Sequence, residues 1–194
     1  AIEQYDQAAR IWRSIPDPSS AAKANLKAGH VYFILSDYAE ASKRYQNAQA
    51  LAAKTTDWLV KARALSHRGR LQSYLGENDV AQAQLDEALH ILDQHDAKAD
   101  VIANSAYGVA LSNLAEVSYS KGNFVKSFEQ SESALKVFQN DRKGAARAHL
   151  FLGYLNGSIG EREKAVAEIS EAQELYRAIS DKNGEGLTQN ALGL

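Results

Sequence analysis

The chain repeats a pattern of small residues with a period of about 40 residues, within the range of repeats that stack into solenoids. The signature residue of each repeat is a glycine or alanine after a mostly aliphatic stretch: Gly29, Gly69, Ala115, Gly153 and Gly193. An alanine follows each of the first four at the nineteenth position: Ala48, Ala88, Ala134 and Ala172. In a solenoid each unit buries its apolar face against its neighbours. We therefore predict a repeat array rather than one central core.

Each repeat has the pattern of two amphipathic helices. In the second repeat, the first helix carries Gly69 and ends at Gly76, and the next carries Ala81, Leu85 and Ala88 at intervals of four and three. This spacing places the apolar residues on one helical face. Because small residues allow two helices to approach closely, we predict that the signature glycine and the alanine that follows it mark the crossing of each pair.

Local signals mark where the helices begin and end. An aspartate precedes four signature residues by 12 positions: Asp17, Asp57, Asp141 and Asp181. A carboxylate there accepts bonds from the unpaired N–H groups of the first turn and favours the positive end of the helix dipole, so we interpret these aspartates as N-caps. Glycine suits a helix C-terminus, and the predicted turns between paired helices are Ser36-Asp37, Gly76-Glu77, Gly122-Asn123 and Gly160-Glu161.

One connector is longer than the others. Successive signature residues are separated by 40, 46, 38 and 40 positions, and the excess lies between Ala88 and Ala115, roughly at 93–107. Asp100 stands 15 rather than 12 positions before Ala115. Two interpretations stay open, either longer helices or a charged local loop. The insertion is either a tolerated surface feature, or else a local contact site or a change in the superhelical pitch of the array.

Composition narrows the function classes. The formal net charge is -2 and cysteine is absent, so nothing favours bulk nucleic-acid binding, and disulfides and thiolate metal sites are excluded. No apolar run is long enough for a membrane span, and we expect a cytoplasmic protein. Both ends have the pattern of helix interiors, so we expect a fragment of a longer array or a processed chain.

Motifs for catalysis and for cofactors are missing. The sequence has no glycine-rich phosphate loop, no H-E-x-x-H and no G-x-S-x-G, and its five histidines form no convincing ligand set. We therefore predict no catalytic residues, no cofactor and no metal site, and a protein that is not an enzyme.

The repeat resembles the tetratricopeptide repeat. That family pairs a Leu-Gly and a following Tyr with an Ala, an aromatic or aliphatic residue and another Ala, and here Gly29, Tyr32, Ala41, Tyr45 and Ala48 match. The resemblance covers essentially the whole chain. The period near 40 is similar to the long-helix subclass found in cell-polarity scaffolds, in kinesin light chains and in bacterial arrays joined to CHAT peptidase domains. The bacterial arrays are the most similar in style.

The resemblance implies an all-α, right-handed superhelical solenoid of antiparallel helix pairs. Its expected extent is a single array over residues 1–194. The predicted divisions are a partial repeat at 1–15, complete repeats at 18–55, 57–95, 97–140 and 141–180, and a partial repeat at 181–194. The third complete repeat departs from the family pattern, because Ser127 and Ser131 stand where Ala and an aromatic are usual.

Ligands of the family lie in the concave groove lined by the first helix of each pair. The resemblance carries the groove to Lys23, His30, Phe33, Arg63, His67, Arg70, Tyr74, Asn113, Glu116, Tyr119, Arg147, Phe151 and Tyr154. Arginines pair carboxylates through two parallel hydrogen bonds, and aromatic rings supply anchoring area. We therefore hypothesise a protein or peptide partner of acidic character. The competing interpretation is a solvated, unused face.

The most favoured function is a protein–protein interaction scaffold. Two alternatives stay open. The array is the regulatory region of a larger enzyme such as a CHAT-type peptidase, or it belongs to a peptide-sensing bacterial regulator. Neither the partner nor the oligomeric state can be inferred from the sequence.

Overall fold

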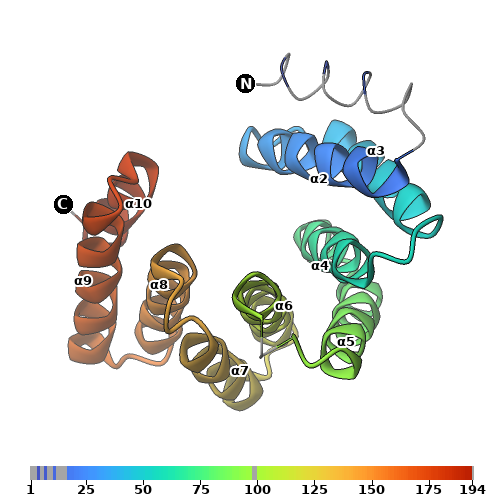
Figure 1. Ribbon diagram of the computed structural model, residues 1–194. Helices are drawn as coiled ribbons and strands as arrows, with labels where there is room; N and C mark the ends of the chain where they lie inside the picture. The colour runs from blue at the N-terminus through green and yellow to red at the C-terminus, as the bar shows by residue number, and fades with distance from the viewer. Residues whose placement is uncertain (1–3, 5–6, 8–10, 12–16, 98–99, 194) are drawn as a thin grey trace. The chain divides into compact units, whose positions relative to one another are not determined.

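The computed structural model describes residues 4, 7, 11, 17–97 and 100–193. The predicted partial repeat at 1–15 therefore lies outside the described residues, apart from three positions. Within them the regular structure is α-helical, without strands (Figure 1). This confirms the predicted all-α class, while the right-handed superhelix stays a prediction. None of the described helices combines the length and apolar character needed to cross a bilayer.

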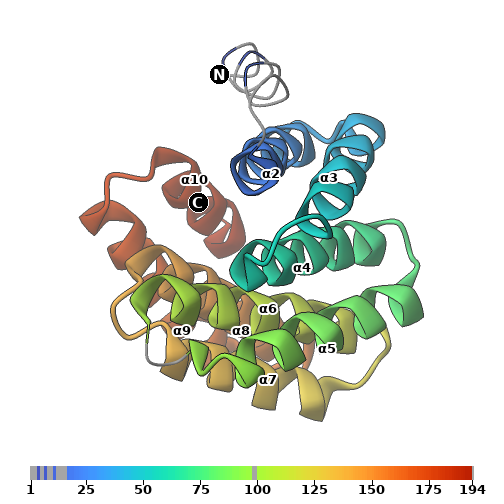
Figure 2. The same ribbon diagram turned by 45° about the vertical axis from the view of Figure 1, so that its right-hand side comes forward.

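The chain divides into two compact units, Ala1–Ala97 (unit 1) and Lys98–Leu194 (unit 2). In unit 1 the helices are α2 (Pro18–Ile34), α3 (Tyr38–Ala52), α4 (Trp58–Tyr74) and α5 (Asn78–Gln94). In unit 2 they are α6 (Val101–Ser120), α7 (Phe124–Val137), α8 (Arg142–Ser158), α9 (Arg162–Ala178) and α10 (Lys182–Leu192). We call the even-numbered helices A helices and the odd-numbered ones B helices. A short turn brings each B helix back along its A helix, as α4 and α5 show in Figure 2.

The predicted N-caps begin the A helices. Asp57 accepts a hydrogen bond from the backbone N–H of Val60 at 3.1 Å, and Asp141 accepts one from that of Gly144 at 2.9 Å. Asp17 and Asp181 cap α2 and α10 in the same way. These bonds satisfy N–H groups that have no partner within the helix.

The A helices end in a left-handed residue, as the turn pattern predicts. At the α4–α5 turn, Gly76 has φ 83°, its N–H donates to Ser73 O, and the N–H of Glu77 donates to Gln72 O at 2.9 Å. This pair of bonds defines a Schellman motif. The α2–α3 turn uses the same motif with Ser36 at φ 60°. Glycine adopts this conformation at little cost, whereas a serine side chain is strained there.

The signature glycines lie against a large side chain of the B helix. A Cβ atom added at Gly29 would stand 2.5 Å from the Tyr45 ring. The same atom at Gly153 would stand 2.5 Å from Ile169. Each of these glycines therefore meets the residue 16 positions later on the B helix. The alanines, Ala48 among them, are fully buried, so the need for small residues at these positions holds.

The connector insertion is partly helix. The α6 helix has 20 residues, against 17 in each of α2, α4 and α8. It begins after Asp100, which accepts a bond from the N–H of Ala103 at 2.8 Å and so caps α6 as the other aspartates cap their helices. The longer-helix interpretation thus explains about half of the insertion, because a capped first turn has been added to α6.

Candidate functional site

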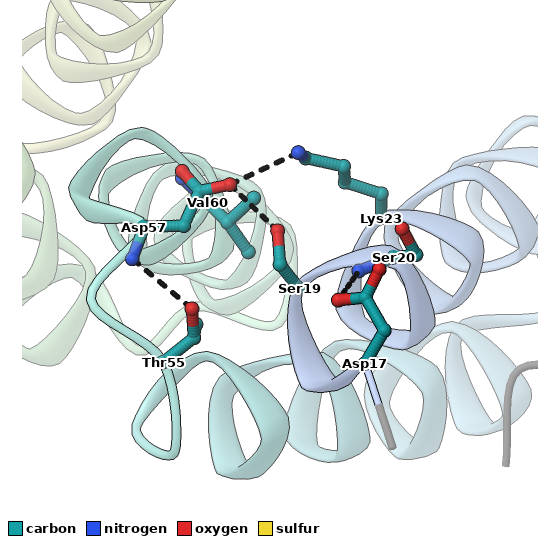
Figure 3. A network of polar contacts seen from close by, with 7 residues as sticks. All are labelled: Asp17, Ser19, Ser20, Lys23, Thr55, Asp57 and Val60. Atoms are coloured by element: carbon teal, nitrogen blue, oxygen red, sulfur yellow. Dashed lines mark hydrogen bonds and ion pairs between the residues drawn. The ribbon is translucent and has the colours of Figure 1, made fainter. Parts of the chain in front are cut away.

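The N-cap aspartates also tie neighbouring A helices together. Asp57 caps α4 with one carboxylate oxygen. Its other oxygen accepts a hydrogen bond from Ser19 Oγ at 2.6 Å and forms an ion pair with Lys23 Nζ at 2.9 Å (Figure 3). The N–H of Asp57 donates to Thr55 Oγ1. Lys23, a predicted groove residue, therefore takes part in holding α2 against α4.

The same arrangement recurs in unit 2. Ser105 Oγ of α6 donates to Asp141 Oδ2 at 2.5 Å, and Lys143 of α8 pairs with Asp181 at 2.8 Å. Of the effects on the pKa of Asp57, burial is the largest, and it raises the pKa. The bonds from Ser19, Lys23 and Val60 together outweigh burial and hold the pKa below the ordinary value. The Lys143 bond lowers the pKa of Asp181. Both carboxylates are therefore stabilised as anions.

Three aromatic side chains form a cluster in unit 1 beside the α2–α3 turn. Phe33 packs edge-to-face on Tyr74 with 4.8 Å between ring centroids, and Tyr38 lies 5.7 Å from Phe33 and 6.2 Å from Tyr74. The Arg70 guanidinium lies over Phe33 at 4.7 Å and over Tyr74 at 5.6 Å. Tyr74 remains 52% exposed. The cluster thus presents an aromatic surface beside a guanidinium.

Aliphatic residues next to Phe33 and Tyr74 in the sequence are exposed as well. Ile34 and Leu35 at the end of α2 are 57% and 60% exposed, and Leu75 at the end of α4 is 49% exposed. The cluster and these three residues together form what we call the unit 1 apolar rim.

The predicted groove residues of α4 share one face. Arg63, His67, Arg70 and Tyr74 follow one another at intervals of four, three and four. His67 stacks on Tyr45 at 5.4 Å and lies 5.9 Å from His30 of α2. Burial raises the pKa of the Tyr45 hydroxyl, against the opposing charge of Arg70, so this hydroxyl stays neutral. The described residues contain no group of three side chains suited to a metal ion.

The A helices of unit 1 carry only positive charge. Neither α2 nor α4 contains an aspartate or a glutamate within its bounds. Their basic residues are Lys23, Lys27, Lys61, Arg63, Arg68 and Arg70. Acidic residues of this unit gather on the B helices instead, with four on α5. Sorting of this kind produces a field of one sign over the A helices.

In unit 2 a predicted groove arginine bonds to the neighbouring A helix. Arg147 of α8 donates to Glu116 Oε1 and to Asn113 Oδ1 of α6, both at 2.6 Å. Asn113 is only 1% exposed. The predicted trio therefore forms an internal network between α6 and α8, in which Glu116 compensates the charge of Arg147.

A second aromatic cluster lies in unit 2. Tyr119 packs edge-to-face on Phe124 at 5.5 Å and on Phe151 at 6.1 Å. Tyr119 and Tyr154 are 38% and 47% exposed. Phe33 and Tyr119 occupy equivalent places, each at the fourth position after its signature residue.

Within the units the structure joins some of the predicted residues: His30 with His67, Phe33 with Arg70 and Tyr74, Arg147 with Asn113 and Glu116, and Tyr119 with Phe151. It also adds two residues that we missed. Tyr38 and Phe124 are the first residues of α3 and α7. Each packs on an aromatic residue in the last turn of the preceding A helix, Tyr38 on Phe33 and Phe124 on Tyr119. We missed them because the groove was drawn from A helices alone. An aromatic directly after a turn was the signal in the sequence.

Comparison with known proteins agrees with the repeat architecture. The family model described as tetratricopeptide repeat matches residues 20–94, which span α2 to α5. Residues 20–94 are thus similar to tetratricopeptide repeats. The family match lies within unit 1, and the helix pairs of unit 2 continue the same arrangement of capped A helices and glycine turns.

One curated relative and two solved structures are similar to this chain. The regulatory protein AfsR of Streptomyces griseus is 25% identical over 171 residues, which are 88% of this chain and 16% of AfsR. A Rap protein solved with competence and sporulation factor matches 97% of this chain with a TM-score of 0.82 and 16% identity. The Rap conjugation gene regulator of plasmid pLS20, solved with the Phr* peptide, matches 97% with a TM-score of 0.80 and 19% identity. The chain spans 52% and 51% of these two Rap chains.

Proposed function

We propose that this chain is a non-catalytic interaction module that binds a peptide or protein segment, of acidic character, on the faces of its A helices. The observation that carries the proposal is the half-exposed aromatic cluster beside the A–B turn in each unit, with Tyr74 in unit 1 and Tyr119 in unit 2. Tyrosine supplies large contact area at a small entropic cost, which is why such residues dominate binding surfaces.

Two further observations support a peptide ligand. One Rap protein of similar fold was solved with the Phr* peptide. The unit 1 apolar rim and the positive A helices also offer both kinds of contact that an acidic segment with apolar side chains needs. We propose a cytoplasmic setting, in line with the cysteine-free composition.

A second candidate is the sensor part of a larger bacterial regulator. The relative AfsR is named a regulatory protein, and the region similar to this chain is 16% of its length. In that case the peptide would act as the signal, and another part of the protein would respond to it. A role beside a CHAT-type peptidase stays a prediction from the family resemblance.

A peptide-display experiment tests the proposal. A phage-displayed library of random dodecapeptides would be selected on the immobilised chain, and the affinities of synthetic copies of the selected peptides measured by fluorescence anisotropy. We expect Tyr74→Ala or Tyr119→Ala to weaken binding about tenfold or more, the usual effect of truncating a central aromatic anchor.

The matched control is Val166→Ala, an apolar position of α9 that is 53% exposed. This variant should bind with unchanged affinity, because it lies on a B helix. Selection of no peptide at all, or equal affinities for the chain and for both tyrosine variants, would contradict the proposal.

A further inference from the structure

The turns that join A and B helices differ in charge between the units. Equivalent segments, which run from four residues before each B helix to its third residue, are 34–40 and 74–80 in unit 1 and 120–126 and 158–164 in unit 2. Both segments of unit 1 contain two acidic residues and neither lysine nor arginine. Segment 120–126 contains two lysines and no acidic residue, whereas 158–164 contains two residues of each sign. Unit 1 therefore has negative turns, and the first turn of unit 2 is positive.

Two acidic side chains of the unit 1 turns are exposed, and their bonding partners are neutral. Asp37 accepts a hydrogen bond from the backbone N–H of Glu40 at 3.1 Å. Glu77 accepts one from the side-chain amide of Gln72 at 3.4 Å. Glu40, by contrast, forms an ion pair with Lys43 at 3.1 Å. The negative charges of Asp37 and Glu77 are therefore available to a partner.

The two turns of unit 1 lie side by side and expose apolar side chains. Tyr38, which begins α3, and Tyr74, which ends α4, have their ring centroids 6.2 Å apart. Leu35 in the first turn and Leu75 in the second are both exposed. We call residues 34–40 and 74–80 together the unit 1 turn surface. This surface combines exposed aliphatic groups with negative charge.

The α6–α7 turn of unit 2 combines similar apolar exposure with the opposite charge. Phe124 and Val125 are both exposed, and Phe124 packs edge-to-face on Tyr119 at 5.5 Å. Lys126 is exposed too, and its ammonium group has no partner in the part of the chain that the structure describes. We call residues 120–126 the unit 2 turn surface.

We propose that a second copy of this chain is the partner of both surfaces, so that the unit 1 turn surface of one copy binds the unit 2 turn surface of another. Asp37 and Glu77 of the first copy lie against Lys126 of the second. The exposed leucines of the first pack against Phe124 and Val125. The inference goes beyond peptide binding and does not depend on it, because the charged residues involved are not among the predicted groove residues.

Charge complementarity favours a second copy as the occupant. Unlike charges across an interface speed association and fix its register, while the burial of apolar groups drives it. The α8–α9 turn lacks this match, because its charges are balanced and Glu161 pairs with Lys164 at 3.4 Å. Since the two bound surfaces differ, each copy carries both halves of the contact. Such heterologous association extends to further copies unless it closes on itself.

A charge-swap experiment on the intact chain tests the inference. Sedimentation velocity would measure the average mass from low micromolar to near-millimolar concentration. We expect association at low salt that is about tenfold weaker near 1 M NaCl, where charges are screened beyond about 3 Å. Glu77→Lys and Lys126→Glu, each measured alone, should weaken association about tenfold or more, because like charges then meet.

An equimolar mixture of these two variants should recover the association. In the mixture the reversed unit 1 turn of one variant meets the reversed unit 2 turn of the other, and the two unchanged turns also match. Every contact between the variants therefore joins unlike charges again. Circular dichroism would verify that each variant is folded.

The matched control is Glu161→Lys. Glu77 and Glu161 both stand at the N-cap of a B helix without a side-chain capping bond, so the two substitutions make the same change at equivalent places. Glu161→Lys should leave association unchanged, because the α8–α9 turn belongs to neither surface. Val125→Ser should weaken association, whereas Val166→Ser, at an exposed position of α9, should not.

Each outcome bears on the pairing of the two surfaces. A chain that stays monomeric at every concentration and salt would overturn the inference. So would undiminished association of folded Glu77→Lys and Lys126→Glu, or a mixture of these variants that fails to associate. Equal weakening by Glu161→Lys would show a dependence on net charge alone and contradict the pairing. Peptide binding is measured separately, so these outcomes leave the proposed function untouched.

Discussion

At the scale of single residues, one carboxylate serves two helices. The two oxygens of Asp57 have partners on different helices. Oδ1 accepts a hydrogen bond from the first turn of α4, and Oδ2 accepts hydrogen bonds from Ser19 and Lys23 of α2. Asp37, which begins α3, accepts a bond from the N–H of Glu40 at an exposed site. Asp57 therefore links helix initiation to the stacking of repeats, which ordinary capping does not do.

This double role predicts a pH-dependent stability. Replacing Asp57 by Ala should destabilise the chain at pH 7 by more than the roughly 1 kcal/mol expected for losing a cap. Since the folded pKa of Asp57 is lowered, its contribution is complete above the ordinary value of 3.8 and is lost as the pH falls through the folded pKa. Urea unfolding at pH 7 and near pH 3 would measure both.

Asp37→Ala is the control for capping alone. We expect its effect at pH 7 to be smaller than that of Asp57→Ala. If the destabilisation by Asp57→Ala were as large near pH 3 as at pH 7, the contacts of the ionised Asp57 carboxylate with Ser19 and Lys23 would not contribute as argued.

At the scale of helices, the pairs balance large residues against small ones. Gly69 faces Leu85 and Gly153 faces Ile169, so a residue without a side chain meets a large one. In the α6–α7 pair the same register sets Ala115 opposite Ser131, so both residues are small. Ser131 Oγ donates to Ser127 O and Ser127 Oγ donates to Ala115 O, both at 2.8 Å, which satisfies the buried hydroxyls. The departure of this repeat from the family pattern is therefore compensated.

A double-mutant cycle at this crossing tests the balance. Ser131→Leu alone should overpack the α6–α7 crossing and destabilise the chain by about 1–3 kcal/mol. Ala115→Gly alone should cost about 1 kcal/mol, because glycine is unfavourable inside a helix. Combined, they recreate the Gly69–Leu85 arrangement, so the double variant should be more stable than the sum of the single effects, as measured by chemical unfolding.

The sign of the coupling decides the outcome. Additive effects, or a double variant less stable than the sum, would mean that Ala115 and Ser131 do not share one packing site. Replacing Val125, which is 71% exposed on α7, by Leu would control for added apolar volume without a crossing and should be nearly neutral.

At the scale of the whole molecule, the repeats fall into two compact units, and the chain passes from one to the other between Ala97 and Lys98. Each unit has most of its contacts within itself. Repeat proteins gain their stability from contacts between adjacent repeats, and within each unit those contacts are present. The family match over residues 20–94 lies inside unit 1. Helices α2, α3 and α4 share one apolar cluster that includes Leu26, Tyr45 and Leu71.

We therefore predict that residues 1–97 and 98–194 each fold when produced separately. Far-ultraviolet circular dichroism of each half should show a helical spectrum and a cooperative loss of signal on heating. The intact chain, measured under the same conditions, serves as the reference. A half with the spectrum of an unfolded chain would show that its core depends on the other unit.

Much of the fold could be predicted because its signals are local. The capping of Asp17 and Asp141 and the turn at Gly76 depend on residues within one helical turn. The glycine–alanine spacing did not show that the signature glycine meets the residue 16 places later. The rotation of the B helix about its axis decides that contact, and periodicity alone does not give it.

The sequence by itself thus determined the helix pairs, their caps and turns, and the residue types on the A helices, because those follow from short-range hydrogen bonding and helical periodicity. Only the tertiary structure decided that Arg147 meets Glu116 and Asn113, and that Arg70 lies over Phe33 and Tyr74. Except for the local Arg70–Tyr74 pair, these partners come from different A helices and are far apart in the sequence. Whether these residues meet depends on how neighbouring A helices are rotated and shifted against each other, and the packing of the core sets that arrangement.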